Sequence, residues 1–271
     1  MKPTAILAIR NEAPYLENCL AHLVENGFDF IVIDNESDDQ SRDIIRSEQF
    51  AGHLLELVSH PYPGHFDWSG LMRQREAAAA RAPSDWVLFV SADEIMHSFR
   101  PGESLSEAIS RIAETGADVI DFNEFVFLPI DQPYRPGIGG YQPIMDYYFF
   151  EPYRPRLMRA RKRDLAVSHI DKGGHTLDGE AYTLAAETLA LRHYIFRDQQ
   201  HAHDKYANRV FPQAELDRGW HGNRHQQAIE AFNWPARDKL KRIGFPEQRT
   251  LDDSQPMTRH YWQWTDPETE S

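Results

Sequence analysis

The chain has 271 residues, enough to bury a sizeable core as one large α/β domain or as two small ones. Hydrophobic residues make up 41% and charged residues 26% of the sequence, a balance that is typical of a folded protein and excludes wholesale disorder. The formal net charge of -13 disfavours nucleic acid and anionic membranes as non-specific partners, because both would repel an acidic protein.

The first elements alternate between strand and helix. Residues 5–9 form a continuous apolar run, which is typical of a parallel strand buried on both faces. A helix is expected from Pro14 to Gly27, where apolar residues recur at helical spacing. Residues 30–33 repeat the strand pattern and stop at Asp34. This order predicts an open, mostly parallel sheet flanked by helices.

The next elements continue the alternation up to a fourth buried strand. We expect a short helix at 41–47, a strand at 54–58, a helix at 70–81 and a strand at 86–90. Ligands of open α/β sheets bind at the carboxyl ends of the strands. The polar clusters that follow three of the strands, at 10–12, 34–35 and 91–94, are therefore expected to meet at one edge of the sheet.

The pattern is weaker after residue 100. We expect a helix-like segment at 102–116, a strand at 119–128, an irregular loop at 129–156, a basic stretch at 154–163, a strand at 188–194 and a helix at 199–218. A loop as long as 129–156 in a compact domain is usually functional or mobile.

The cellular setting follows from what the sequence lacks. Cys19 is the only cysteine, so no intrachain disulfide can form. No signal-peptide pattern precedes the first strand, and no apolar stretch approaches the ~20 residues of a spanning helix. We therefore expect a cytoplasmic enzyme with no transmembrane segment, acting in solution or peripherally at the inner face of a membrane.

The turn after the first strand shows whether the sequence fits a dinucleotide-binding Rossmann fold. It contains no glycine, and the sequence has no GxxxxGK[ST] loop, so neither NAD binding nor a P-loop is supported. Asp93 and Glu94 indicate different chemistry, because carboxylates at the end of a buried strand can hold a divalent ion that bridges a diphosphate. Alone, these two acids fit equally well as caps of the following helix or turn. Their position in the sheet favours a metal site.

Several ordered motifs resemble a family 2 glycosyltransferase with the GT-A fold. They are Leu7-Ala8-Ile9-Arg10-Asn11-Glu12, Ile31-Val32-Ile33-Asp34-Asn35-Glu36-Ser37-Asp38-Asp39 and Asp85-Trp86-Val87-Leu88-Phe89-Val90-Ser91-Ala92-Asp93-Glu94, with a fainter match at Leu191-Arg192-His193-Tyr194. The resemblance covers roughly the first 100 residues. It implies a nucleoside-diphosphate-sugar donor, often a UDP-sugar, and inverting transfer assisted by Mn²⁺ or Mg²⁺.

The resemblance also implies a set of nucleotide-binding residues. These are Arg10, Asn11, Glu12 and Asp34 at the base and ribose, together with Ser91 and Ala92 of the acidic motif. Arg73, on the helix before the fourth strand, is our first candidate for neutralising the charge of the leaving diphosphate, ahead of Arg75, Lys205 and Arg197. The alternative for each of these cations is ordinary helix-surface charge.

Asp93 would be the main metal ligand, since it matches the last acid of the family's Asp-x-Asp motif. His193 would complete the metal site from its His-Tyr context, although a given one of 13 histidines is more often an ordinary surface or core side chain. Ser91 departs from the family, which usually has the first aspartate there. A serine hydroxyl is a poor ligand for a divalent ion.

An inverting transferase also needs a carboxylate that takes the proton of the acceptor hydroxyl. The candidates after residue 100 are Asp121, Glu124, Asp146, Glu151 and Asp171. We favour Glu124 as the catalytic base because it lies near the end of the strand after the metal motif. The alternative is a solvated strand residue.

The predicted fold is α/β: a GT-A-like nucleotide-binding fold with a mainly parallel mixed sheet flanked by helices, plus a C-terminal helical extension. Residues 1–100 would form the nucleotide-sugar-binding half, 101–195 the acceptor-side half of the same domain and 196–271 the extension. The predicted function is metal-dependent, inverting sugar transfer to a glycan, lipid-linked or other hydroxyl acceptor, as in polysaccharide biosynthesis. Two alternatives stay open: a degenerate transferase that binds nucleotide or glycan without turnover, and a sugar-phosphate nucleotidyltransferase, whose usual glycine-rich loop is absent.

Overall fold

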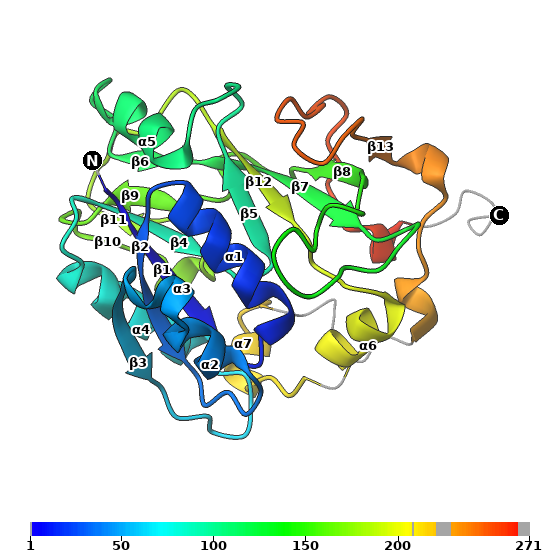
Figure 1. The fold of residues 1–271 in the computed structure, drawn as a ribbon, viewed down its shortest axis with the longest axis horizontal. Coiled ribbons are helices and arrows are strands. Elements are labelled where there is room, and N and C mark those ends of the chain that lie inside the picture. The colour runs from blue at the N-terminus through cyan, green and yellow to red at the C-terminus, as the bar shows by residue number, and fades with distance from the viewer. Residues whose placement is uncertain (1, 208, 221–228, 265–271) are drawn as a thin grey trace.

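A six-stranded sheet organises the N-terminal part of the computed structural model, which describes residues 2–207, 209–220 and 229–264 (Figure 1). Its strand order is β3-β2-β1-β4-β9-β6. The strands are β1 (Thr4–Ile9), β2 (Asp29–Asp34), β3 (Leu54–Ser59), β4 (Trp86–Val90), β6 (Val119–Ile120) and β9 (Ala160–Lys162). The first four pair in parallel, and β9 pairs antiparallel with both β4 and β6. The expected α/β architecture with a mainly parallel sheet is confirmed.

Two helices cover opposite faces of this sheet. The helix α1 (Ala13–Glu25) packs on the face that carries Leu7. The helix α4 (Trp68–Arg81) packs on the other face, which carries Ile6 and Phe89. Successive strand residues point to opposite faces, so a strand that is apolar throughout can be covered on both sides. Two short helices beside α1 are α2 (Ser41–Arg46) and α3 (Glu48–Ala51).

A second sheet of five strands lies beside the first, with the order β13-β8-β7-β12-β5 (Figure 1). Its strands are β5 (Glu94–His97), β7 (Phe122–Leu128), β8 (Asp146–Phe150), β12 (Leu189–His193) and β13 (Lys241–Arg242). Only β7 and β12 pair in parallel. We expected the first sheet to continue into the acceptor-side half, and we expected residues 129–156 to be irregular. The first sheet does continue into residues 101–195 through β6 and β9, but β7, β8 and β12 of that part belong to the second sheet, and β8 forms inside the stretch that was expected to be irregular.

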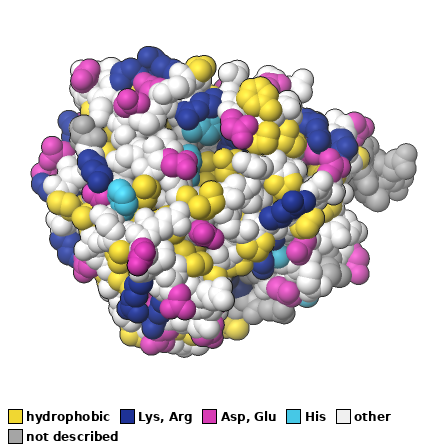
Figure 2. All heavy atoms as spheres, viewed as in Figure 1, with side chains coloured by type: hydrophobic (Ala, Val, Ile, Leu, Met, Phe, Trp, Pro, Cys, Tyr) yellow, Lys and Arg dark blue, Asp and Glu magenta, His cyan; other side chains and the backbone are white. Residues whose placement is uncertain are grey.

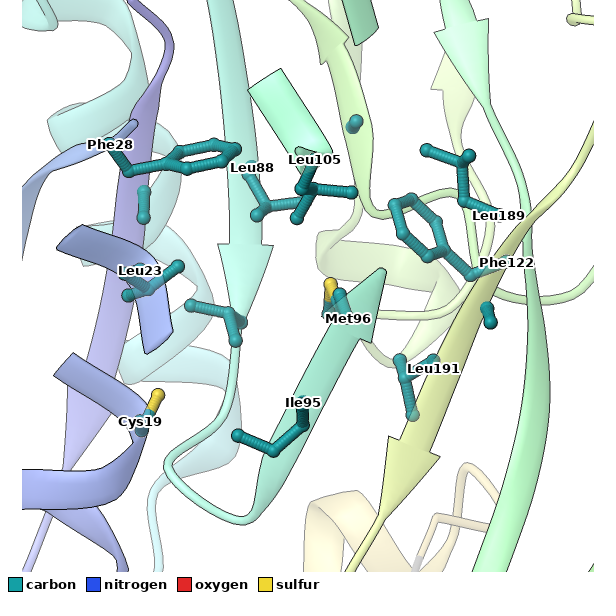
Figure 3. Close-up of a cluster of buried hydrophobic side chains, with 14 of the residues drawn as sticks. Cys19, Leu23, Phe28, Leu88, Ile95, Met96, Leu105, Phe122, Leu189 and Leu191 are labelled. Atoms are coloured by element: carbon teal, nitrogen blue, oxygen red, sulfur yellow. The ribbon is translucent and has the colours of Figure 1, made fainter. Parts of the chain in front are cut away.

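One hydrophobic core joins the two sheets (Figure 3). It includes Cys19 and Leu23 of α1, Leu88 of β4, Ile95 of β5 and Leu191 of β12. The helix α5 (Leu105–Ala113) adds Leu105 and begins at a capping box between Ser104 and Glu107. Because β5 follows β4 after only three residues and is packed by the same core, the segment 91–94 is held between the two sheets.

The C-terminal part is less helical than expected. Its helices are α6 (Gln199–Ala207), α7 (Gln213–Leu216) and the 3-10 turns η2 (Ile229–Phe232), η3 (Arg237–Lys239) and η4 (Tyr261–Gln263). The helix predicted at 199–218 is interrupted because Pro212, which has no backbone N–H, precedes α7. An aromatic cluster that contains Phe196, Tyr206 and Trp262 packs this part against β8. Residues 208, 221–228 and 265–271 of the predicted extension lie outside the described residues.

Smaller elements and the surface complete the description. The remaining elements are β10 (Val167–Ser168), η1 (Ile170–Lys172) and β11 (Asp178–Gly179). On the face shown in Figure 2, acidic and basic side chains are interspersed, so the net charge of -13 does not form a single acidic patch there. Within the described part of the chain, no helix is both long and apolar enough to cross a membrane.

Candidate active site

A cleft of about 1290 Å³ opens at the carboxyl ends of β1 and β4. Residues 10–12 follow β1, residues 91–94 follow β4, and both segments line the cleft. Glu124 and His193 line it from the second sheet, and Lys205 lines it from α6. The three polar clusters meet at this edge, since Arg10 donates to the backbone of Asn35, but only residues 10–12 and 91–94 line the cleft. Lys205 adds a cation from the C-terminal part.

Opposite charges alternate along a chain of side chains in this cleft. Asp93 Oδ2 accepts a hydrogen bond from Lys205 Nζ at 2.7 Å and lies 3.4 Å from His193 Nε2. The other ring nitrogen of His193, Nδ1, lies 2.6 Å from Glu124 Oε1. The second oxygen of Glu124, Oε2, pairs with Arg156. Each of the two carboxylates is thus shared between two cationic side chains.

The alternating charges shift the pKa values of Asp93, His193 and Glu124. Burial alone would raise the pKa of Asp93, but Lys205 and His193 hold it well below its usual range. Burial lowers the pKa of His193, yet Asp93 and Glu124 together raise it to about 10. The pKa of Glu124 lies well below its usual range, because Arg156 and His193 outweigh its burial. At neutral pH the two acids are therefore ionised and His193 is an imidazolium.

The segment 91–94 is fixed by Glu94. The Glu94 carboxylate accepts a hydrogen bond from the backbone N–H of Ser91 at 2.8 Å and one from Arg159 at 2.7 Å. Asp93 is held by its backbone, since its carbonyl accepts from Tyr194 N at 2.8 Å. Ser91 and Ala92 line the cleft beside Asp93. Glu94 therefore shapes the motif, and Asp93 presents its carboxylate.

Arg10 stabilises the β1 end of the cleft. Its Nη1 donates to the backbone carbonyls of Asn35 at 2.6 Å and Glu36 at 2.5 Å. Its guanidinium carbon lies 3.6 Å from the ring centre of Tyr62, which also lines the cleft. A cation over the face of an aromatic ring is attracted to the ring, so this contact holds Arg10 and Tyr62 together. The loops after β1 and β2 are thereby tied to the loop that carries Tyr62.

The next two residues extend this end. Asn11 adopts a left-handed φ of 56° and exchanges hydrogen bonds with Asp38 at 2.7 and 2.9 Å. Glu12 lines the cleft, and burial raises its pKa to about 7 against the opposing charge of Lys205. Glu12 is therefore the carboxyl group of the site whose protonation changes near neutral pH.

Two expected nucleotide-binding residues do not line the cleft. Asp34 is buried, accepts a hydrogen bond from Ser37 N at 3.0 Å and pairs with Arg42, so it shapes the loop after β2. Arg73 is exposed on α4, because the phase of that helix turns Arg75 toward the sheet instead. The assignment of Arg73 as the phosphate clamp is therefore corrected.

Sequence reasoning did not assign several residues that line the cleft. They include Arg156, Arg159, Arg209, Phe66 and Trp68. The rings of Phe66 and Trp68 stack at 5.6 Å, and Trp68 Nε1 donates to Gly173 O at 2.9 Å. The basic stretch 154–163 was the available indication for the first two, but nothing in it shows which arginines face the cleft. Lys205 was only a secondary candidate, behind Arg73.

The donor set of the cleft does not fit a divalent ion in this arrangement. The Asp93 oxygen nearest His193 is also the oxygen that accepts from the Lys205 ammonium at 2.7 Å, and a second cation there would be repelled. Ser91 offers only a hydroxyl, and both oxygens of Glu94 are engaged. Among the described residues, no three His, Cys, Asp or Glu side chains are arranged to hold a metal.

The sequence profile described as glycosyl transferase family 2 matches residues 4–174, more than half of the chain. The chain belongs to this family. The matched segment contains the loops after β1, β2 and β4, and the expected GT-A-like architecture is accordingly confirmed. No curated protein sequence matches the chain.

Solved structures resemble this family member at a distance. A crystal structure of S. aureus TarS 1–349 is 19% identical, with a TM-score of 0.40, and the match covers 68% of this chain and 60% of that one. A longer TarS structure is 16% identical, with a TM-score of 0.43 and coverage of 80% and 42%. The mannosyltransferase PcManGT from Pyrobaculum calidifontis, in complex with GDP-Man and Mn²⁺, is 20% identical, with a TM-score of 0.34 and coverage of 48% and 37%. The family 2 chain thus spans 60% or less of these proteins.

Proposed function

We propose that this family 2 protein transfers a sugar from a nucleoside-diphosphate sugar, with a UDP-sugar as the first candidate, to a hydroxyl acceptor with inversion. The observation that carries the proposal is the meeting of residues 10–12, Asp93 and Lys205 in one cleft at the carboxyl ends of β1 and β4. This edge is where open α/β sheets bind ligands. Residues 10–12 would contact the nucleoside, and the charged group around Asp93 would face the diphosphate.

The reaction places two demands on the protein. The acceptor oxygen attacks the anomeric carbon, the bond from that carbon to the diphosphate oxygen breaks with its electron pair, and the acceptor proton passes to a base. Negative charge therefore grows on the leaving diphosphate and must be met by preorganised positive charge. Lys205 and Arg209 both line the cleft and are the cations that we assign to this task. The acceptor, whether a glycan or a lipid-linked group, belongs to the same proposal without a residue assignment.

The structure changes the role that we propose for Glu124. Both of its oxygens are engaged, by His193 and by Arg156, and its pKa lies well below the usual range. A carboxylate held in this way is a weak base, since efficient proton transfer needs a pKa near the working pH. We therefore assign Glu124 to orienting His193 rather than to taking the acceptor proton.

Metal-dependent transfer with Mn²⁺ or Mg²⁺ on Asp93 and His193, which the family resemblance implies, stays a prediction for experiment. Asp93 and His193 would hold such an ion, which would supply positive charge to the leaving diphosphate. No step of the proposed reaction depends on it, because the Asp93 oxygen that faces His193 is held by Lys205.

The first experiment measures binding of UDP and GDP by calorimetry, with Mn²⁺ and with EDTA, followed by hydrolysis of a panel of UDP-sugars. We expect one nucleotide to bind at micromolar to millimolar Kd and its sugar conjugate to be hydrolysed slowly. Failure of both nucleotides to bind under both conditions would disprove the transferase proposal. Binding without hydrolysis or transfer would instead favour the non-catalytic alternative, for which Ser91 is the motivating feature.

A further inference from the structure

We propose that Lys205 supplies from within the chain the positive charge that a divalent ion would bring to Asp93, so that donor binding does not require a metal. This inference rests on the proposed function, because it concerns how the diphosphate of the donor is held. It makes Lys205 a binding residue of the donor site and places the counter-charge of the leaving group on α6.

The position of Lys205 is defined by two hydrogen bonds. Its Nζ donates to Asp93 Oδ2 at 2.7 Å and to the carbonyl of Ile195 at 3.1 Å, and its side chain is only 13% exposed. An ammonium has three donors. Since these two bonds are the ones it makes to the part of the chain that the structure describes, the third donor is available to a ligand in the cleft that Lys205 lines.

The surroundings of Asp93 favour a lysine over a metal. Ser91 stands where a second carboxylate ligand would be, and Glu94 is occupied by Arg159 and by the backbone of its own segment. Asp93 is thus the single carboxylate that the segment 91–94 can offer to a cation. Its Oδ2 atom already has an ammonium at hydrogen-bond distance.

The fold around α6 keeps the lysine in place. Tyr206, the next residue, is buried in the aromatic cluster, where its ring lies 5.4 Å from Phe196 and 6.0 Å from Phe232. Because Tyr206 and Phe196 flank Lys205 and Ile195 in the sequence, the same cluster fixes both the side chain and its carbonyl partner. A cation that is already held in position needs little reorganisation when a charged ligand binds.

A second cation accompanies the lysine. Arg209 lines the same cleft, and its guanidinium carbon lies 4.4 Å from the ring centre of Phe66. Two positive side chains match the charge of a diphosphate better than Lys205 alone. Arginine also offers two parallel donors to phosphate oxygens. The ligand class that fits these cations is the diphosphate of a nucleotide.

The test compares the wild type with Lys205→Met, which keeps the stem and removes the ammonium. The matched control is Lys162→Met, because Lys162 donates to Asp118 at a similar 2.8 Å but lies in β9, outside the cleft. Calorimetry gives the Kd of UDP and GDP in EDTA and in Mn²⁺ for all three proteins. Thermal unfolding confirms that each variant is folded, and electron paramagnetic resonance reports bound Mn²⁺ without nucleotide.

We expect the wild type to bind nucleotide equally well in EDTA and in Mn²⁺, and Lys162→Met to match it. Lys205→Met should bind on the order of 10- to 100-fold more weakly in EDTA, as for the loss of a charged hydrogen bond. Added Mn²⁺ should restore part of that affinity, since Asp93 Oδ2 is then no longer occupied by the Lys205 ammonium.

Two results would overturn the inference and leave the transferase proposal intact: wild-type binding that needs Mn²⁺, or a folded Lys205→Met that binds normally in EDTA. If neither nucleotide binds the wild type with or without metal, the proposed function itself fails, and the lysine inference falls with it.

Discussion

Asp93 and Lys205 are separated by 112 residues in the sequence, yet Asp93 Oδ2 and Lys205 Nζ lie 2.7 Å apart in the structure. Asp93 could be found from the sequence, because a buried strand leads directly to it. Lys205 could not be selected with the same means, because its place depends on how α6 packs on aromatic residues that follow no regular spacing. The same holds for Arg73 and Arg75: both were candidates, and only the observed helix phase shows that Arg73 faces solvent.

Glu124→Gln tests the positioning role at the residue scale. The amide cannot hold both His193 and Arg156 as the carboxylate does, so we expect the turnover of UDP-sugar hydrolysis to fall about 10- to 100-fold while the Kd of UDP changes little. The pKa of His193, about 10 in the wild type, should decrease in an NMR titration because one of the two acids that raise it is lost.

The pH profile separates positioning from base catalysis. A positioning role predicts that the acidic limb of the rate profile stays at the same pH in Glu124→Gln with a lower plateau. Disappearance of that limb would mean that Glu124 is the base.

At the scale of elements, the parallel strands and α1 were predictable because each is a long apolar pattern with clear ends. The antiparallel strands were not, since β9 is three residues long and forms only by pairing with β4 and β6. The pairing of β9 also creates a buried polar contact that could not be predicted from the local sequence pattern. Arg161 of β9 donates to Glu76 of α4 at 2.6 Å, and Glu76 also accepts from the backbone of His169 at 2.8 Å.

Glu76→Gln tests this contact through the pH dependence of stability. Burial would raise the pKa of Glu76, but His169 and Arg161 lower it to about 2. A carboxyl group with a lowered pKa in the folded state stabilises the protein above the unfolded pKa of 4.5 and loses that contribution as the pH falls toward 2.

We therefore expect Glu76→Gln to reduce the free energy of unfolding by about 2–3 kcal/mol at pH 7 and the difference to shrink between pH 4.5 and 2, measured by urea titration. Glu56→Gln removes an exposed pair with Arg81 and should change stability by less than about 1 kcal/mol. Equal effects of the two changes would contradict the assignment.

At the scale of the whole molecule, two sheets share one core and the C-terminal part closes the cleft. The sequence predicted the first sheet and a C-terminal addition. The second sheet and the irregular course of the addition depend on long-range contacts, such as β13 pairing with β8 and the aromatic cluster packing on it. These contacts join residues whose local patterns are weak, which is why the prediction became poorer along the chain.

Phe196→Ala tests the coupling between this cluster and the cleft. Phe196 is fully buried, so its truncation should cost about 3–5 kcal/mol of stability and loosen α6, which carries Lys205. We expect the affinity for UDP to fall in calorimetry at a temperature where the variant is folded. Phe50→Ala, at an equally buried position of α3 outside the cleft, should lose comparable stability and keep its affinity. Normal UDP affinity in folded Phe196→Ala would show that the cluster does not position the cleft.

The family match ends at residue 174, whereas His193, Lys205 and Arg209 come after it. The cleft is thus assembled from two stretches of chain: the first contributes residues 10–12 and 91–94 together with Arg156 and Arg159, and the second adds His193, Lys205 and Arg209. On the proposed function, a chimera that takes its C-terminal third from another family 2 protein would exchange the cations that neutralise the diphosphate. It would keep the same nucleobase preference. On the Lys205 proposal, grafting the C-terminal third of this chain onto a metal-requiring family 2 transferase should give a protein that binds its donor in a chelator.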